Sequence, residues 1–202
     1  MNVEIINICE QSTLSIAETA KKLYPDLKLG KLGSSVTQRL FKKLIRHRDI
    51  VLKTKSIMFN IKCPLFVYYE FQSLLANKLQ IPRFSIIDSD NIEFDIDEKF
   101  SEKHTSLLTC LHKKVKFILK KIDTGSITDE QLLYFLPMSI MISFPLVVDF
   151  LELFDILSIG KTHNCTKKMK SLISNIYEPI NSKFPELFTT HSIEVYISSK
   201  ES

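Results

Sequence analysis

The stretch FNIKCPLFVYYEFQSLLANKLQ, residues 59–80, joins a strand pattern to a helix pattern at one proline. Before Pro64, apolar and polar residues alternate, which predicts a strand at 55–61. Proline fits the first turn of a helix, where its missing N–H would have no partner, so Pro64 marks the start of the next helix. That helix contains two tyrosines and Glu70 and has almost no charge, which indicates that it is buried or lines a binding site.

The sequence before this stretch predicts a further strand and two helices. Residues 2–8 alternate between apolar and polar side chains, as in a strand. Residues 13–24 place apolar side chains at helical spacing and end at Pro25, which cannot continue a helix. A second amphipathic helix is expected at 35–47, after a loop and a serine that can cap it.

The sequence after this stretch is predominantly helical in pattern. RFSIID and NIEFDI are two short alternating runs, which predict a hairpin or two irregular strands. Helices are then predicted at 100–121, 128–142, 145–158 and 165–183. The tail HSIEVYIS alternates at Ile193, Val195 and Ile197, so a closing strand is expected. These elements predict one α+β domain over 1–202, with a mixed or antiparallel sheet and a large helical block.

Length and charge limit the possible classes of protein. A chain of 202 residues can form one domain with a sizeable core. The 27 basic and 23 acidic residues leave a net charge of +4, which is mild for a dedicated nucleic-acid-binding protein. The lysine-rich runs at 112–121 and 161–170 fit the solvated faces of helices. A nucleic-acid partner is therefore not expected.

Cysteine usage and hydropathy indicate a cytoplasmic protein. The four cysteines are spread along the chain without a CxxC pair, which argues for reduced thiols and against a zinc site. The N-terminus has acidic residues within its apolar run and does not resemble a signal peptide. The uncharged run at 132–148 contains Pro137 and Pro145, which favours buried core helices over a membrane span.

Common catalytic motifs are absent from the sequence. It contains no GxxxxGK[ST], GxGxxG, HExxH or GxSxG pattern. His104 and His112 would point in different directions about two turns apart on one helix, which argues against a shared metal. Asp95, Asp97 and Glu98 are interpreted as solvated acids. Catalytic motifs alone therefore identify no function.

The order of the elements resembles the flavin-dependent thymidylate synthases, a family that methylates deoxyuridylate using bound FAD. The opening MNVEIINICEQSTLSIAETAKKLYP is similar to the first strand and helix of that family, and FNIKCPLFV, residues 59–67, is similar to its FTFHIKAPIFVARQ block. Further similarity lies in GSITDEQLLYFLP, PLVVDFLELF and THNCTKKMKSLISNIYEPINSKFPELF. The resemblance spans about residues 1–188 and implies the fold of this family.

The resemblance also identifies candidate site residues, by position in the family motifs. Family members carry an RHRxxSxNxxSxRY signature that holds FAD and the nucleotide. Glu70 stands in place of the glutamine before that signature, Lys78 in place of its first serine, and Arg83 matches its arginine. Lys168 takes the position of the arginine that activates the uracil ring in the family. The resemblance therefore implies nucleotide binding by Glu70, Lys78 and Arg83 and a catalytic role for Lys168.

The RHR triplet itself is replaced by Ser73, Leu74 and Leu75. This exchange removes up to three donors, and a hydrogen bond to a charged group contributes about 1.5–3 kcal/mol. Two hypotheses follow. The first is a non-catalytic family member that serves as a structural or regulatory subunit, in a homotetramer or with an active relative. The alternative is an enzyme that methylates deoxyuridylate, or a related pyrimidine nucleotide, with FAD, NADPH and methylenetetrahydrofolate through a rearranged site.

Overall fold

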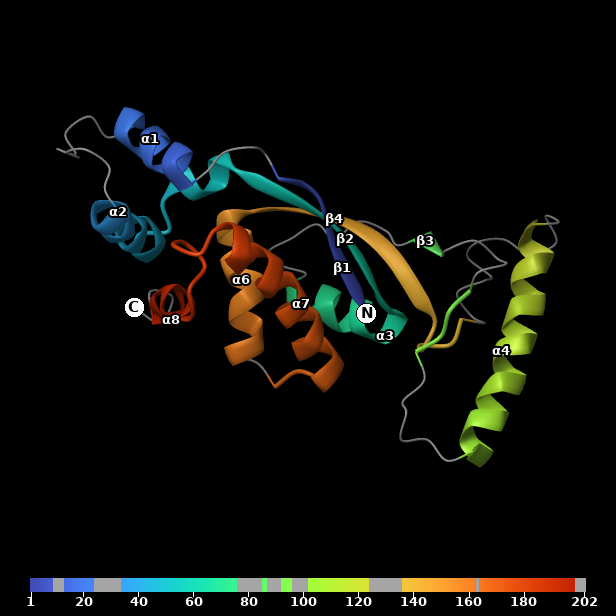
Figure 1. Cartoon of the computed structure of the whole chain (residues 1–202). Helices are drawn as coiled ribbons and strands as arrows, with labels where there is room; N and C mark the ends of the chain where they lie inside the picture. Colours follow the sequence, from blue (N-terminus) through green and yellow to red (C-terminus); the bar gives the residue numbers. More distant parts are fainter. Residues whose placement is uncertain are drawn as a thin grey trace.

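The computed structural model describes residues 1–8, 13–23, 34–75, 85–86, 92–95, 102–123, 136–162 and 164–198, and they form an α+β fold (Figure 1). The strands are β1 (Asn2–Ile8), β2 (Ser56–Pro64), β3 (Ser85–Ile86) and β4 (Met141–Asp149). The helices are α1 (Thr13–Leu23), α2 (Ser34–Arg46), the 3₁₀ helix η1 (Ile50–Thr54), α3 (Leu65–Leu75), α4 (Glu102–Asp123), α6 (Phe150–Thr162), α7 (Lys167–Lys183) and α8 (Thr190–Ser198).

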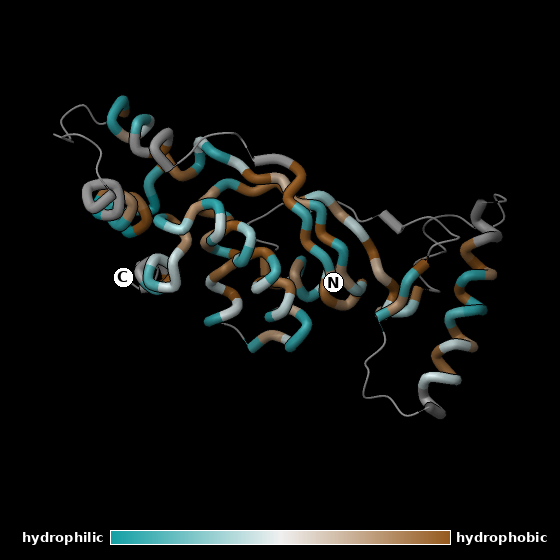
Figure 2. Tube along the Cα trace, viewed as in Figure 1, coloured by the Kyte–Doolittle hydropathy of each residue, from teal (hydrophilic) through white to brown (hydrophobic). Residues whose placement is uncertain are grey.

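The four strands form an antiparallel sheet in the order β1-β2-β4-β3. One face of the two central strands is buried, because side chains alternate along a strand and one set points to the core. The buried set comprises Ile57, Phe59, Ile61, Cys63, Ile142, Phe144, Leu146 and Val148. Helices α3, α6 and α7 lie on that side of the sheet (Figure 1). Figure 2 shows hydrophobic residues along both of these strands.

Helix α3 begins directly at the end of β2, as the position of Pro64 predicts. The first N–H groups of a helix have no partner within the helix. Here the N–H groups of Leu65 and Phe66 donate to the carbonyl oxygens of Ile140 and Met138, at 2.9 Å and 3.0 Å. These bonds fix the start of α3 against the segment that leads into β4.

Helix α6 follows β4 without a loop because Asp149 and Glu152 form a capping box. The Asp149 N–H donates to Glu152 Oε2, and the Glu152 N–H donates to Asp149 Oδ1, both at 2.8 Å. These two bonds satisfy N–H groups that the helix itself leaves without a partner.

The predicted helices at 128–142 and 145–158 are wrong where they cover 141–149. Those residues form β4, which pairs with β2 from Ser56↔Asp149 to Pro64↔Met141. Residues 124–135 lie outside the described part, and α6 begins only at Phe150. On the side of β4 away from β2, strand β3 pairs only with Ser143 and Ile142. Among the described residues, Pro145 therefore has no strand neighbour on that side. Proline is tolerated at such an edge because it lacks the N–H that a neighbour would need.

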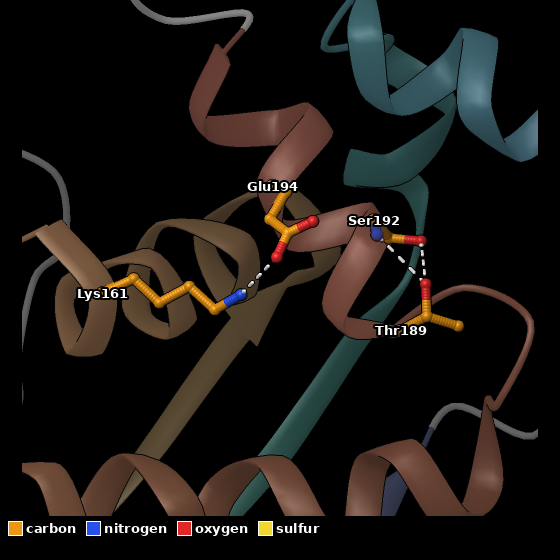
Figure 3. Close-up of polar contacts among 4 residues, drawn as sticks. All are labelled: Lys161, Thr189, Ser192 and Glu194. Carbon is orange, nitrogen blue, oxygen red and sulfur yellow. Dashed lines mark hydrogen bonds and ion pairs between the residues drawn. The ribbon is translucent and has the colours of Figure 1, made fainter.

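The predicted closing strand is also wrong, because residues 190–198 form helix α8. Thr189 initiates this helix, since its Oγ1 accepts the Ser192 N–H at 3.0 Å and lies 2.8 Å from Ser192 Oγ (Figure 3). Lys161 Nζ of α6 lies 3.4 Å from Glu194 Oε1 of α8, which links the two helices (Figure 3).

The other predicted elements are confirmed with shifts of a few residues at their ends. The described parts of RFSIID and NIEFDI, residues 85–86 and 92–95, do not pair with each other as a hairpin. Strand β3 pairs with β4, and Phe94 forms a bridge with Ile140 just before β4. Within the described part of the chain, no helix is both long and apolar enough to cross a membrane. The uncharged run at 132–148 ends in β4 rather than in the core helices that its sequence predicts.

Candidate functional site

Two of the four predicted site residues, Glu70 and Lys168, lie at the N-terminus of α7. Thr166 caps this helix, since its Oγ1 accepts the Met169 N–H at 3.2 Å. Glu70 reaches Thr166 from α3: its Oε1 accepts the Thr166 N–H at 2.8 Å, and its Oε2 accepts the Thr166 hydroxyl at 2.6 Å. A carboxylate here also interacts favourably with the positive end of the helix dipole. Glu70 therefore joins α3 to the start of α7.

Lys168 forms an ion pair with Asp95, with 2.8 Å between Lys168 Nζ and Asp95 Oδ1. The side chains are 39% and 19% exposed, respectively, so the pair lies partly out of water. The Asp95 N–H donates to the Ser139 carbonyl oxygen at 2.8 Å, which holds Asp95 in place. The interpretation of Asp95 as a solvated acid is therefore wrong. Lys78 and Arg83 lie outside the described residues.

Apolar side chains of α3 on either side of Glu70 pack into the core. Leu75 is fully buried, and Leu74 is half-buried against the core. Tyr68 is also buried and packs edge-on against Phe144 at a centroid distance of 5.1 Å. Burial raises the pKa of the Tyr68 hydroxyl, as do the neighbouring Tyr69 and Cys63. Tyr69 alone of this group is exposed.

The described cysteines Cys63, Cys110 and Cys165 are free thiols. Cys63 lies in the core beneath the sheet, and burial raises its pKa to about 12. A thiol is nucleophilic only as the thiolate, so Cys63 is not suited to nucleophilic catalysis.

Among the described residues, no three His, Cys, Asp or Glu side chains come together as they would around a metal ion. His112 is buried and stacks on Phe94, with ring centroids 3.5 Å apart and ring planes 5° from parallel. This contact connects α4 to the segment that contains Asp95. His112 therefore has a packing role.

A group of carboxylates at the start of α6 faces the segment around η1. Buried Asp155 lies 3.8 Å from Arg48, measured from Oδ2 to Nη2. The pKa of Glu152 is raised, mainly by burial, although the hydrogen bond from the Asp149 N–H lowers it. The ion pair between Asp155 and Arg48 links α6 to the turn between α2 and η1, in which Arg48 has a positive φ of 48°. The sequence reasoning did not single out these contacts.

A scan against protein-family models and a search among curated proteins both found no match to this chain.

The contact between Glu70 and Thr166 gives the first prediction. Glu70→Ala is expected to lower the free energy of unfolding by about 1–2 kcal/mol, because two charge-assisted hydrogen bonds are lost at a partly exposed position. Thr166→Val is expected to cost a similar amount, about 1–2 kcal/mol, because it also removes the helix cap. Urea unfolding of both single variants and of the double variant measures these losses.

The double variant should lose at least about 0.5 kcal/mol less than the sum of the single losses, because both changes remove the same contact. Glu178→Ala, at an exposed position of α7, is the control and is expected to change stability by less than about 0.5 kcal/mol. Fully additive losses would contradict a direct contribution of the Glu70–Thr166 contact.

His112 gives a prediction about pH. Its pKa is lowered by burial and, to a smaller extent, by Lys116, so the folded protein resists protonation of this ring. As pH falls below the ordinary histidine value of about 6.5, the unfolded chain takes up a proton more readily than the folded one, and stability falls. The uptake of one proton cannot change the free energy of unfolding by more than about 1.4 kcal/mol per pH unit.

His112→Phe keeps a ring against Phe94 and is expected to make this acid loss shallower between pH 6.5 and the lowered pKa. Urea unfolding at several pH values measures the slope, and His191→Phe, at an exposed position, is the control. An unchanged slope in His112→Phe would show that other groups cause the acid loss.

Proposed function

We propose that this protein is a non-catalytic relative of the flavin-dependent thymidylate synthases and acts as a structural or regulatory subunit in pyrimidine deoxynucleotide metabolism. The observation that carries the proposal is that Glu70 and Lys168 both bind other side chains of the chain itself. Residues that the resemblance assigns to ligand binding thus serve to hold the fold together.

Glu70 is the clearer case of the two. Both of its carboxylate oxygens accept hydrogen bonds from Thr166, at 2.8 Å and 2.6 Å. A carboxylate also repels the phosphate of a nucleotide, whereas a glutamine in its place does not. Glu70 is therefore better suited to joining α3 and α7 than to binding a nucleotide.

Lys168 keeps the positive charge of the arginine that it replaces but not its geometry. A guanidinium offers a planar fork of donors, while an ammonium is a single point charge on a flexible stem. The Lys168 ammonium is already paired with Asp95 at 2.8 Å. A pyrimidine ring would have to compete with this carboxylate for it.

Leu74 and Leu75 support the same proposal. Leu75 is fully buried and Leu74 packs against the core, so neither offers a donor to a flavin. Apolar side chains in place of charged ones favour closing a former ligand site by burial. Without a ligand site, such a scaffold can still assemble with copies of itself or with an active relative. We expect this assembly in a reducing compartment such as the cytoplasm.

Ligand binding tests the proposal. The purified full chain is expected to be colourless, and its thermal unfolding is expected to be unchanged by FAD or deoxyuridylate. A ligand at 100 times its Kd would add about 2.7 kcal/mol, which is readily measured. Sedimentation of the same sample is expected to show an oligomer.

The variant Glu70→Gln with Lys168→Arg serves as the comparison, because it restores the family residue at both positions. It is expected to remain colourless, since the RHR triplet is still missing. A yellow wild-type protein that releases FAD on denaturation would contradict the proposal and favour the enzyme with a rearranged site.

A further inference from the structure

Helix α4 is strongly basic. It contains six lysines against Glu102 and Asp123, so its net charge of +4 equals that of the whole protein. Figure 1 shows α4 standing apart from α6, α7 and α8, at the far end of the sheet. The remainder of the protein is therefore neutral overall, although α2 is also strongly basic, with four basic and no acidic residues.

The two sides of α4 both carry apolar residues. The inner side is buried through His112, Val115 and Leu119. The opposite side, called the outer face below, consists of Leu107, Cys110, Leu111, Lys114, Phe117 and Ile118. Leu107 is 64% exposed and Leu111 is 45% exposed. Helices with a single core-facing side normally place polar residues at such positions.

Lys114 lies in the middle of the outer face. Residues three and four positions apart are neighbours on a helix, so Cys110, Leu111, Phe117 and Ile118 surround it. An open hollow of about 430 Å³ lies here, lined by Cys110, Lys113, Lys114, Phe117 and Ile118. Among the described residues, Lys114 forms no ion pair. The outer face thus combines apolar side chains with one central ammonium group.

We propose that the outer face of α4 docks an amphipathic, acidic segment of a partner protein. The apolar residues of that segment cover Leu107, Leu111 and Ile118, and one of its carboxylates pairs with Lys114. Laying an amphipathic helix on an apolar surface with complementary charge is a common mode of peptide recognition. The proposal does not depend on whether the protein binds a nucleotide or flavin.

Charge argues against two other occupants of the outer face. A second α4 would bring two helices of net charge +4 together, which like-charge repulsion disfavours. A membrane would place the Lys114 ammonium in the middle of the side that enters the lipid, where a charge is costly. A carboxylate from a protein segment instead pairs with the ammonium.

Fluorescence anisotropy with the full chain tests the proposal. The probes are three dye-labelled peptides with leucines at helical spacing and glutamates on the flanks, which differ only in a central Glu, Gln or Lys. The Glu peptide is expected to bind at least about tenfold more tightly than the Gln or Lys peptide. Lys114→Glu is expected to reverse the preference in favour of the Lys peptide. Lys116→Glu makes the same charge change on another side of α4 and should alter affinities by less than about twofold.

Alkylation of Cys110 supplies a second readout, because this thiol is exposed on the outer face next to Lys114. Mass spectrometry is expected to show that the Glu peptide slows modification of Cys110 several-fold, with no such effect in Lys114→Glu. Cys110 modification at an unchanged rate would overturn docking at this face.

Other outcomes would also overturn the proposal. If none of the peptides binds, or if Lys116→Glu acts as strongly as Lys114→Glu, the outer face is not the docking site. Vesicles of phosphatidylcholine with phosphatidylserine test the membrane, and sedimentation tests a second copy. The double variant Leu107→Ser with Leu111→Ser removes apolar side chains from the outer face. If the protein binds vesicles or self-associates and this variant does not, the outer face binds a membrane or a second copy instead. Both leucines are exposed, so unchanged circular dichroism is expected to show that this variant folds.

Discussion

Val148→Asp is expected to lower the free energy of unfolding by more than about 4 kcal/mol, while Val147→Asp changes it by about 1 kcal/mol or less. The two residues are neighbours in β4, but Val148 is 1% exposed and Val147 is 55% exposed. Aspartate at 148 would put an unpaired charge among the side chains beneath the sheet, whereas aspartate at 147 remains in water. Urea unfolding of both variants measures the difference.

The pair also tests whether residues 141–149 form a strand. Successive side chains of a strand point to opposite faces, so the identical change at adjacent positions should cost very different amounts of stability. In a helix the same two residues lie about 100° apart instead of on opposite sides, so the helix geometry does not require such a contrast. Equal losses in the two variants would therefore contradict the strand.

The block around Pro64 could be predicted because two independent local signals agree there. Alternation indicates the strand, and the position of Pro64 indicates where the helix begins. Helices α1, α2 and α7 could be predicted for a similar reason, since each has an amphipathic pattern and a recognisable boundary.

Strand β4 could not be predicted because its apolar run fits a buried helix as well as a buried strand. Its pairing with β2 decides the outcome, and β2 lies far away in the sequence. Helix α8 shows a similar ambiguity: Ile193 and Ile197 are four residues apart, so they share one face in a helix and one face in a strand. The hydrogen bonds of Thr189 and the packing of Ile193 into the core favour the helix.

The candidate site could be predicted only in part. The family resemblance pointed to Glu70 and Lys168, and the structure places both at the start of α7. Their partners, Thr166 and Asp95, could not be found from sequence, because each contact joins segments that only the folded chain brings together. Sequence reasoning identifies residues of unusual type, while their availability to a ligand depends on such long-range contacts.

Phe188→Ala is expected to lower the free energy of unfolding by about 3–5 kcal/mol. Phe188 is fully buried after α7, where it stacks on Phe154 at a centroid distance of 4.7 Å and packs edge-on against Phe150 at 5.3 Å. Truncation removes apolar burial and these ring contacts and leaves a cavity that the surrounding helices cannot fill completely.

Phe117→Ala is the matched control for Phe188→Ala, because it removes the same atoms from a side chain that is 63% exposed on α4. Its loss is expected to stay below about 1 kcal/mol, and urea unfolding of both variants provides the comparison. Phe188→Leu should recover most of the lost stability, because leucine refills much of the cavity. An equal or smaller loss in Phe188→Ala than in Phe117→Ala would show that the contacts of Phe188 with Phe150 and Phe154 do not hold the C-terminal part of the chain against α6. The loss expected for Phe188→Ala thus tests the packing of the segment between α7 and α8 against α6.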